Sequence, residues 1–129
     1  MKDRIKSFED LDVYRKLCEL HLEVSKLSLS FPKFELHELG SQIRRSSNSI
    51  AANIAEGWNN KHINIYLEGI NRAQAELQET KHHLCVACQK RYLSEEAYET
   101  YLERYGECGK MLRGLVRSLQ KWKTAGKRL

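Results

Sequence analysis

The sequence contains one proline and seven glycines among its 129 residues, and it has no long apolar run. Because proline and glycine are the usual breaks between elements, we expect few and long elements. The longest apolar run, residues 84–88, is far shorter than the about 20 residues that a membrane-spanning helix requires. The first residues carry no apolar signal-peptide core, so we expect no secretory signal. These shortages favour a single soluble globular domain.

Acidic residues are absent from the last part of the chain. The segment 110–129 has seven basic residues and no acidic one, which leaves 15 basic against 17 acidic residues in 1–109. The net charge of +5 therefore arises in this segment alone. Any binding to nucleic acid or to another anionic partner is predicted there.

The four cysteines lie among helix-forming residues, which favours reduced thiols in a cytoplasmic protein over a disulfide framework. Cys85 and Cys88 form a single CxxC motif, whereas a structural zinc site needs four ligands. Glu79 and His82 form a single Glu-x-x-His pair, whereas a di-metal centre in a bundle needs two such pairs and two further glutamates. We therefore predict no metal, no cofactor and no catalytic residue. The alternative is a metal enzyme that uses Glu79, His82 and the cysteines.

Apolar residues recur at spacings of three and four in four segments, and no segment alternates convincingly with a period of two. The predicted helices span about residues 8–30, 36–58, 62–91 and 95–122. Ser7 with Asp10 is expected to cap the first helix, Pro32 to end it, and Ser94 to cap the fourth. Short connections between four helices predict an all-α, antiparallel up-down-up-down bundle in residues 1–122, followed by a basic tail in 123–129.

The apolar stripes also predict which residues are buried. Leu36 is expected to begin the buried side of the second helix, and Trp122 to end the buried stripe of the fourth. The first helix carries a second apolar line that one bundle seam does not need: Leu11, Tyr14, Cys18 and Leu22. This line favours contact with a neighbouring subunit, and a wide core-facing stripe is the alternative.

The last half of the fourth predicted helix carries a row of cations. At 100° per residue, Lys110, Arg113, Arg117 and Lys121 fall within about 80° of one another, opposite the apolar stripe. The row is about 16 Å long at the helical rise, and Lys123, Lys127 and Arg128 extend it into the tail. Helix ends favour cations, but this effect fades within the last turn and the row begins three turns earlier. We therefore predict a nucleic-acid or acidic-partner surface, with a solvated face as the alternative.

Residues 41–57 read SQIRRSSNSIAANIAEG, which resembles the signature of the four-helix-bundle proteins encoded in 23S rRNA intervening sequences. Residues 8–14, 31–32, 74–79 and 93–98 resemble other segments of that family. The resemblance covers residues 7–120, nearly the whole chain.

The family is similar to the accessory variability proteins of diversity-generating retroelements, which form homopentameric barrels and bind a reverse transcriptase and nucleic acid. The resemblance thus implies a non-enzymatic homopentamer that binds RNA or DNA, with a reverse transcriptase as a further partner. A structural protein–protein scaffold without nucleic-acid binding is the alternative. Four residues are carried over from the signature: Arg44 and Arg45 for the nucleic-acid surface, and Asn53 and Glu56 as polar groups that fix packing.

Overall fold

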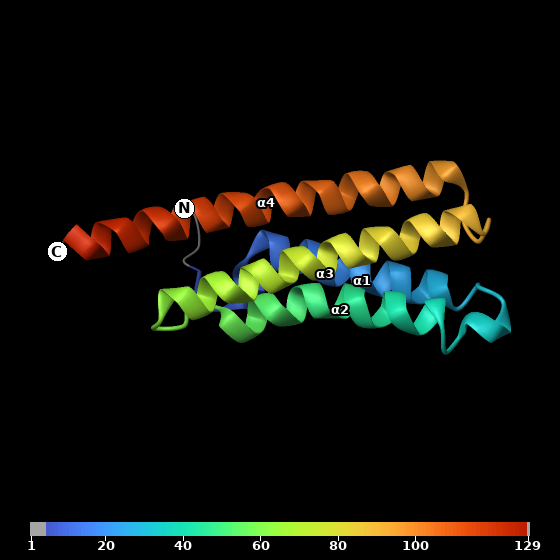
Figure 1. Cartoon of the computed structure of the whole chain (residues 1–129), viewed down its shortest axis with the longest axis horizontal. Helices are drawn as coiled ribbons and strands as arrows, with labels where there is room; N and C mark the ends of the chain where they lie inside the picture. Colours follow the sequence, from blue (N-terminus) through green and yellow to red (C-terminus); the bar gives the residue numbers. More distant parts are fainter. Residues whose placement is uncertain (1–4, 129) are drawn as a thin grey trace.

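Four α-helices make up the protein in the computed structural model, which describes residues 5–128, and side chains as far as residue 125. They are α1 (Asp12–Ser28), α2 (Leu39–Gly57), α3 (Ile63–Gln89) and α4 (Glu95–Arg128), with one-turn 3-10 helices η1 (Phe8–Asp10) and η2 (Lys33–Glu35). Consecutive helices run in opposite directions, side by side (Figure 1). The described residues contain no strand, which confirms the all-α prediction of four helices. None of the described helices has the length and apolar character needed to cross a membrane.

The ends of the helices follow local chemistry. Ser7 and Asp10 form the expected reciprocal cap, but it encloses the short η1, and α1 begins after it at Asp12. The hydroxyl of Ser94 accepts from the Ala97 amide at 3.1 Å and caps α4 as predicted. The predicted start of the second helix at Leu36 is wrong, because η2 intervenes after Pro32 and α2 begins at Leu39. Leu36 is accordingly 41% exposed instead of buried.

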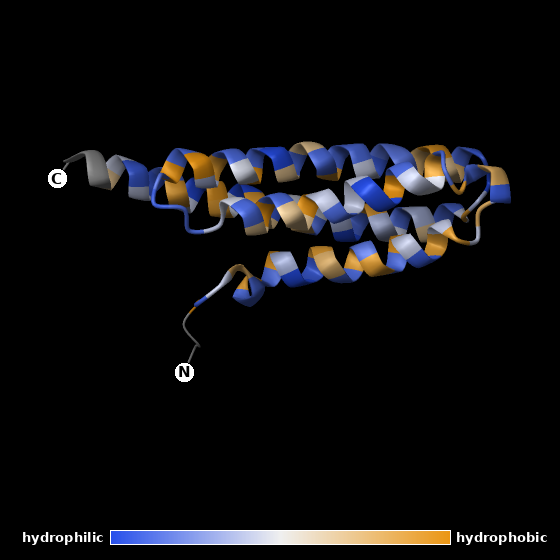
Figure 2. Cartoon of the chain, turned by 90° about the horizontal axis from the view of Figure 1, so that it is seen from below, coloured by the Kyte–Doolittle hydropathy of each residue, from blue (hydrophilic) through white to orange (hydrophobic). Residues whose placement is uncertain are grey.

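The core runs along the bundle between amphipathic helices, in which hydrophobic and hydrophilic residues interleave (Figure 2). Each helix contributes fully buried aliphatic side chains, among them Leu17, Ile43, Ile70 and Leu112. The contact between α2 and α3 is the most extensive one in the bundle, and that between α1 and α4 is the sparsest between neighbouring helices. These burial patterns agree with the stripes predicted from the three- and four-residue spacings.

Two glycines let α2 and α3 approach closely near their connecting turn. A Cβ atom at Gly69 would lie 2.8 Å from the Asn53 carbonyl oxygen, and one at Gly57 would lie 3.1 Å from the Ile65 carbonyl oxygen. Real Cβ atoms essentially never come as close as the first distance. The helix backbones therefore meet directly at this place, where no larger residue fits.

We call one end of the bundle the closed end. Here the α1–α2 connection contacts the α3–α4 turn. Glu35 from η2 is 1% exposed, and its Oε2 accepts from Lys90 Nζ and from the Tyr92 hydroxyl, both at 2.8 Å. The ring of Phe31 packs on Tyr92 with centroids 5.0 Å apart. Lys90 lowers the pKa of the Glu35 carboxyl through its hydrogen bond, and Tyr92 adds to the effect. A paired and buried carboxylate thus ties the two connections together.

The opposite end, which we call the open end, consists of the α2–α3 turn (58–62) and α4 beyond Leu119. Here α4 projects past the other helices (Figure 1). The predicted burial of Trp122 is wrong: its side chain is 76% exposed, although Cys108 and Leu112 on the same stripe are buried. The apolar stripe continues along α4, but this end of α4 projects past the helices that would cover it.

The segment predicted as a separate tail continues α4 as helix through Arg128. No proline interrupts it, and cations suit the carboxyl end of a helix. Lys123 Nζ donates to Asn64 Oδ1 at 2.7 Å and ties this part of α4 to the start of α3.

Candidate nucleic-acid interface

The predicted row of cations lies on the outer face of α4. Lys110, Arg113, Arg117 and Lys121 are all exposed. None of the four forms an ion pair or a side-chain hydrogen bond with any residue that the structure describes. Arg117 and Lys121 line a shallow groove along the helix together with Gln120, Thr124 and Ala125. The structure therefore brings four unpaired positive charges onto one exposed face.

Three further cations were predicted to extend this row. Lys123 lies at the open end and is half-buried, with its amine on Asn64. Lys127 and Arg128 belong to the last helical turn, and their side chains lie outside the described residues. The described part of the interface therefore rests on the four cations of the row.

Two charged side chains in the first half of α4, Arg104 and Glu107, pair with α1. The guanidinium of Arg104 donates to both carboxylate oxygens of Glu23, with Nη1 at 2.7 Å from Oε1. This hydrogen bond holds the pKa of Glu23 below its usual value. Lys16 Nζ lies 3.5 Å from Glu107 Oε1. Arg104 and Glu107 thus pair with a neighbouring helix, whereas the four cations of the row face solvent.

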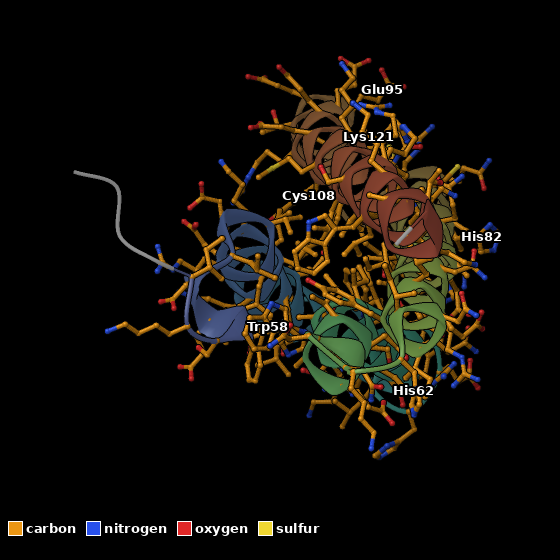
Figure 3. The ribbon with its side chains drawn as sticks, turned by 90° about the vertical axis from the view of Figure 1, so that its left-hand side faces the viewer. Trp58, His62, His82, Glu95, Cys108 and Lys121 are labelled. Carbon is orange, nitrogen blue, oxygen red and sulfur yellow. The ribbon has the colours of Figure 1, made fainter. Side chains whose placement is uncertain are left out.

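Arg44 and Arg45 do not join the row. Arg44 donates from Nη1 to Ser28 Oγ at 2.9 Å and from Nη2 to the Leu36 carbonyl oxygen at 2.7 Å, so it supports the α1–α2 connection. Arg45 is exposed and lies 3.5 Å from Glu79 Oε2. Both belong to α2, which occupies the corner of the bundle opposite α4 (Figure 3). We therefore leave them out of the candidate interface.

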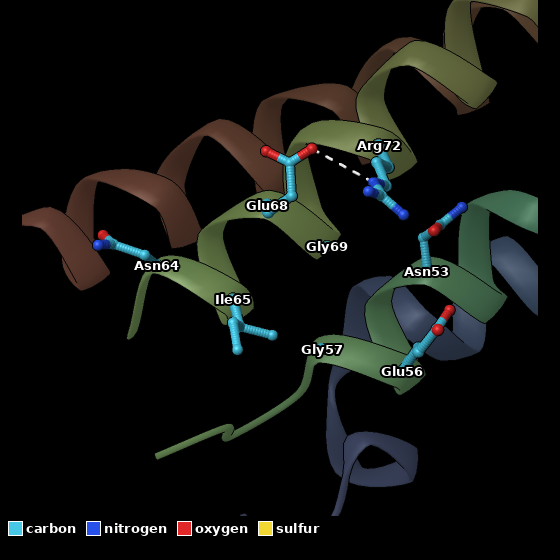
Figure 4. Close-up of a pocket in the computed structure, with 8 residues that line it drawn as sticks. All are labelled: Asn53, Glu56, Gly57, Asn64, Ile65, Glu68, Gly69 and Arg72. Carbon is cyan, nitrogen blue, oxygen red and sulfur yellow. Dashed lines mark hydrogen bonds and ion pairs between the residues drawn. The ribbon is translucent and has the colours of Figure 1, made fainter. Parts of the chain in front are cut away.

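Asn53 and Glu56 line a pocket of about 310 Å³ between the end of α2 and the start of α3 (Figure 4). Asn53 donates from Nδ2 to the Ser49 carbonyl oxygen of its own helix at 2.8 Å, and Glu56 is exposed. On the α3 side, Arg72 and Glu68 form an ion pair at 3.2 Å. The pocket is therefore lined by two carboxylates and one guanidinium. Its net charge is negative, which disfavours the binding of a phosphate. The sequence analysis did not predict this pocket. The two glycines that line it, Gly57 and Gly69, were the available sign that α2 and α3 come close together here.

The cysteines do not form a reactive centre in this fold. Burial is the main cause that raises the pKa of the Cys88 thiol, and Glu95 raises it further. Burial also raises the pKa of Cys108 to about 11. Glu79 pairs with His83 at 3.2 Å instead of joining His82. Among the described residues, no three His, Cys, Asp or Glu side chains are grouped as metal ligands would be. The raised pKa values of Cys88 and Cys108 make these two thiols weak nucleophiles at neutral pH.

Comparison with known proteins identifies a family model and a similar solved structure. A family model described as 23S rRNA-intervening sequence protein matches residues 9–114. A crystal structure of a protein of unknown function from the S23 ribosomal protein family of Bacteroides thetaiotaomicron VPI-5482 is 28% identical, with a TM-score of 0.70. The match covers 81% of this chain and 97% of that one. Comparison with curated proteins gives no match. Residues 115–129, which include Arg117, Lys121 and Trp122, lie beyond the range of the family model.

Proposed function

Since the chain belongs to the 23S rRNA-intervening sequence protein family, we propose that it is a non-enzymatic protein that binds nucleic acid through the basic face of α4. The observation that carries the proposal is the row of Lys110, Arg113, Arg117 and Lys121, exposed and unpaired among the described residues. Unpaired cations on one helix face can neutralise phosphates without first breaking an internal ion pair. Arg15, Lys16, Arg45 and Arg72, by contrast, each lie in an ion pair within the chain.

The dimensions of the row suit a phosphate backbone. It extends about 16 Å along α4, and the phosphates of one duplex strand advance about 3.4 Å each along the axis. The row can therefore follow several successive phosphates. The sequence carries no recognition-helix or zinc-finger motif, so the expected binding depends on charge and not on base sequence.

The test is binding of labelled RNA and DNA, measured by fluorescence anisotropy over a range of salt concentrations. Replacing all four cations of the row with glutamine should weaken binding strongly and reduce the salt dependence, by about 0.9 in the logarithmic slope for each duplex phosphate that the row no longer neutralises. The matched control makes the same change of charge at four cations that are paired within the chain: Arg15, Lys16, Arg45 and Arg72. An equal weakening in both variants would show that net charge, and not the row, determines binding.

Self-association is the second part of the proposal. On the second apolar line of α1, Leu11, Tyr14 and Cys18 pack against the core, which favours the wide-stripe alternative for these three. Leu22 on that line is 68% exposed, as is Leu29 one heptad later. We propose that these two leucines meet another copy of the chain. Light scattering after gel filtration should give a multiple of the 15.1 kDa chain mass, which Leu22→Glu with Leu29→Glu should reduce. A monomer at all concentrations contradicts this part alone.

A homopentameric assembly remains a prediction from the family resemblance. So does binding to a reverse transcriptase. The scaffold alternative makes a different prediction for protein purified from its host. Nuclease treatment should release the partners of a nucleic-acid-binding protein, whereas it should leave the partners of a pure protein scaffold bound.

A further inference from the structure

Trp122 is the most exposed large hydrophobic side chain among the described residues. Leu119, one turn earlier on the same stripe, still packs against the core, but Trp122 does not. Its side chain is 76% exposed, so this part of the stripe is largely uncovered. A tryptophan in this position adds nothing to the core and leaves a flat aromatic surface in water.

The surroundings of Trp122 are cationic. Lys121 precedes it, Lys123 follows it, and α4 has no acidic residue after Glu107. A second copy of the same helix end would therefore bring like charges together, so self-pairing is disfavoured here. An acidic peptide would satisfy the lysines but would leave the indole without a specific partner. A nucleotide carries both complementary groups, an aromatic base and a phosphate.

The position of Trp122 relative to the row selects one form of nucleic acid. Consecutive helical residues point about 100° apart, so Trp122 lies on the apolar side of α4, roughly a quarter of a turn around the helix from Lys121, the last cation of the row. In a duplex the bases are already stacked on one another and only the phosphates can reach the row. An unpaired strand that follows the row as far as Lys121 can turn a base onto the neighbouring indole. Stacking of successive bases on aromatic side chains beside a basic groove is how single strands are generally bound.

We propose that the open end of α4 binds single-stranded nucleic acid, with an unpaired base stacked on Trp122 and the adjoining phosphates on Lys121 and Arg117. This inference rests on the proposed function of the row and adds a preference for single strands. Trp122 lies beyond residues 9–114, the range that the family model matches. The preference therefore arises in a part of α4 outside the range of the family match.

The experiment uses the full chain with Trp58→Phe, which leaves Trp122 as its only tryptophan. Short oligo(dT) and oligo(U) strands and a duplex of equal length are added at fixed salt while indole fluorescence is followed. We expect strong quenching by the single strands and little by the duplex. The oligo(dT) and oligo(U) arms distinguish DNA from RNA as the source of the unpaired base.

Affinities of variants then separate stacking from proximity. Trp122→Ala should weaken single-strand binding about 5- to 150-fold, leave duplex binding unchanged, and leave the salt dependence unchanged. Trp122→Phe should restore most of the single-strand affinity, because phenylalanine keeps an aromatic face. Phe34→Ala, which removes an exposed apolar side chain in η2 at the closed end, is the matched control and should change neither affinity.

Two failures have different meanings. If the wild-type chain binds neither the strands nor the duplex in a salt-dependent way, the proposed function and this inference are both wrong. If it binds both, and Trp122→Ala leaves single-strand affinity unchanged or weakens duplex binding equally, only the stacking inference is wrong. Because Trp122 is exposed, the variants should melt at the wild-type temperature, which circular dichroism verifies.

Discussion

The closed and open ends of the bundle use charged and aromatic residues in opposite ways. At the closed end the Glu35 carboxylate is buried between Lys90 and Tyr92, and the ring of Tyr92 packs on Phe31. At the open end Lys121 is unpaired among the described residues and Trp122 stands in solvent. The same residue types therefore hold two chain connections together at one end and remain available to a partner at the other. The comparison shows that enclosure by the fold, and not residue type, determines whether these charged and aromatic groups are paired within the chain.

The largest effect should come from the apolar stripe of α4, which passes from the covered part of the bundle to the open end. Leu112→Ala should lower the free energy of unfolding by about 2–5 kcal/mol, because Leu112 is completely buried and its truncation leaves a cavity. Trp122→Ala should change it by no more than about 0.5 kcal/mol, as for other exposed positions. Urea denaturation followed by circular dichroism measures both. Similar decreases at the two positions would mean that the open end is covered in solution.

A smaller effect is expected at the closed end. Glu35→Gln should lower the melting temperature by several degrees at neutral pH, because Lys90 loses its buried countercharge. Glu103→Gln, at an exposed residue of α4 with no ion pair among the described residues, is the control and should leave the melting temperature unchanged.

The closed end also predicts a pH dependence with a definite sign. The folded-state pKa of Glu35 lies below its ordinary value of 4.5, so its stabilisation is present above that pH. It is lost as the pH falls through the folded-state pKa. Melting curves of wild type and Glu35→Gln should therefore converge as the solution is acidified below about pH 4. A difference in melting temperature that stays constant down to about pH 2 would contradict stabilisation by the ionised Glu35 carboxylate.

The smallest effect should come from the exposed ion pair that joins α4 to α1. A double-mutant cycle with Arg104→Ala and Glu23→Ala should give a coupling of about 0.2–1 kcal/mol that decreases as salt is added. Both side chains are partly in water, which screens their attraction.

The four-glutamine variant of the row should be as stable as the wild type, because its cations have no described partner. A marked destabilisation of that variant would reveal contacts that make the row structural.

Much of the fold follows from the sequence because helical periodicity is local. The spacings of three and four place Leu17, Ile43, Ile70 and Leu112 on inward faces, and all four are buried. The Ser94 cap was equally predictable, since a cap depends on residues within one turn. Periodicity gives the direction of a side chain but not the length of the neighbouring helices. For this reason Trp122 was assigned to the core, although α4 projects past its neighbours.

The candidate interface was predictable in part, for the same reason. The row on α4 is a local pattern of one helix, and its four side chains are exposed as expected. The partners of Arg44 are Ser28, the last residue of α1, and the Leu36 carbonyl in the α1–α2 connection, 16 and 8 residues away, so its structural role could not be predicted from the periodicity of α2. Glu35 gave no signal either, because its partner Lys90 is 55 residues distant and only the folded bundle brings the two together.

The direct backbone contact of α2 and α3 at Gly57 and Gly69 also bears on the order in which the chain folds. The turn 58–62 between these helices is short, so bringing them together costs little loop-closure entropy. The first and last helices, by contrast, are far apart in the sequence. Their contact is the least extensive one between neighbouring helices. We expect the α2–α3 hairpin to be the kinetic nucleus and the α1–α4 seam to close last.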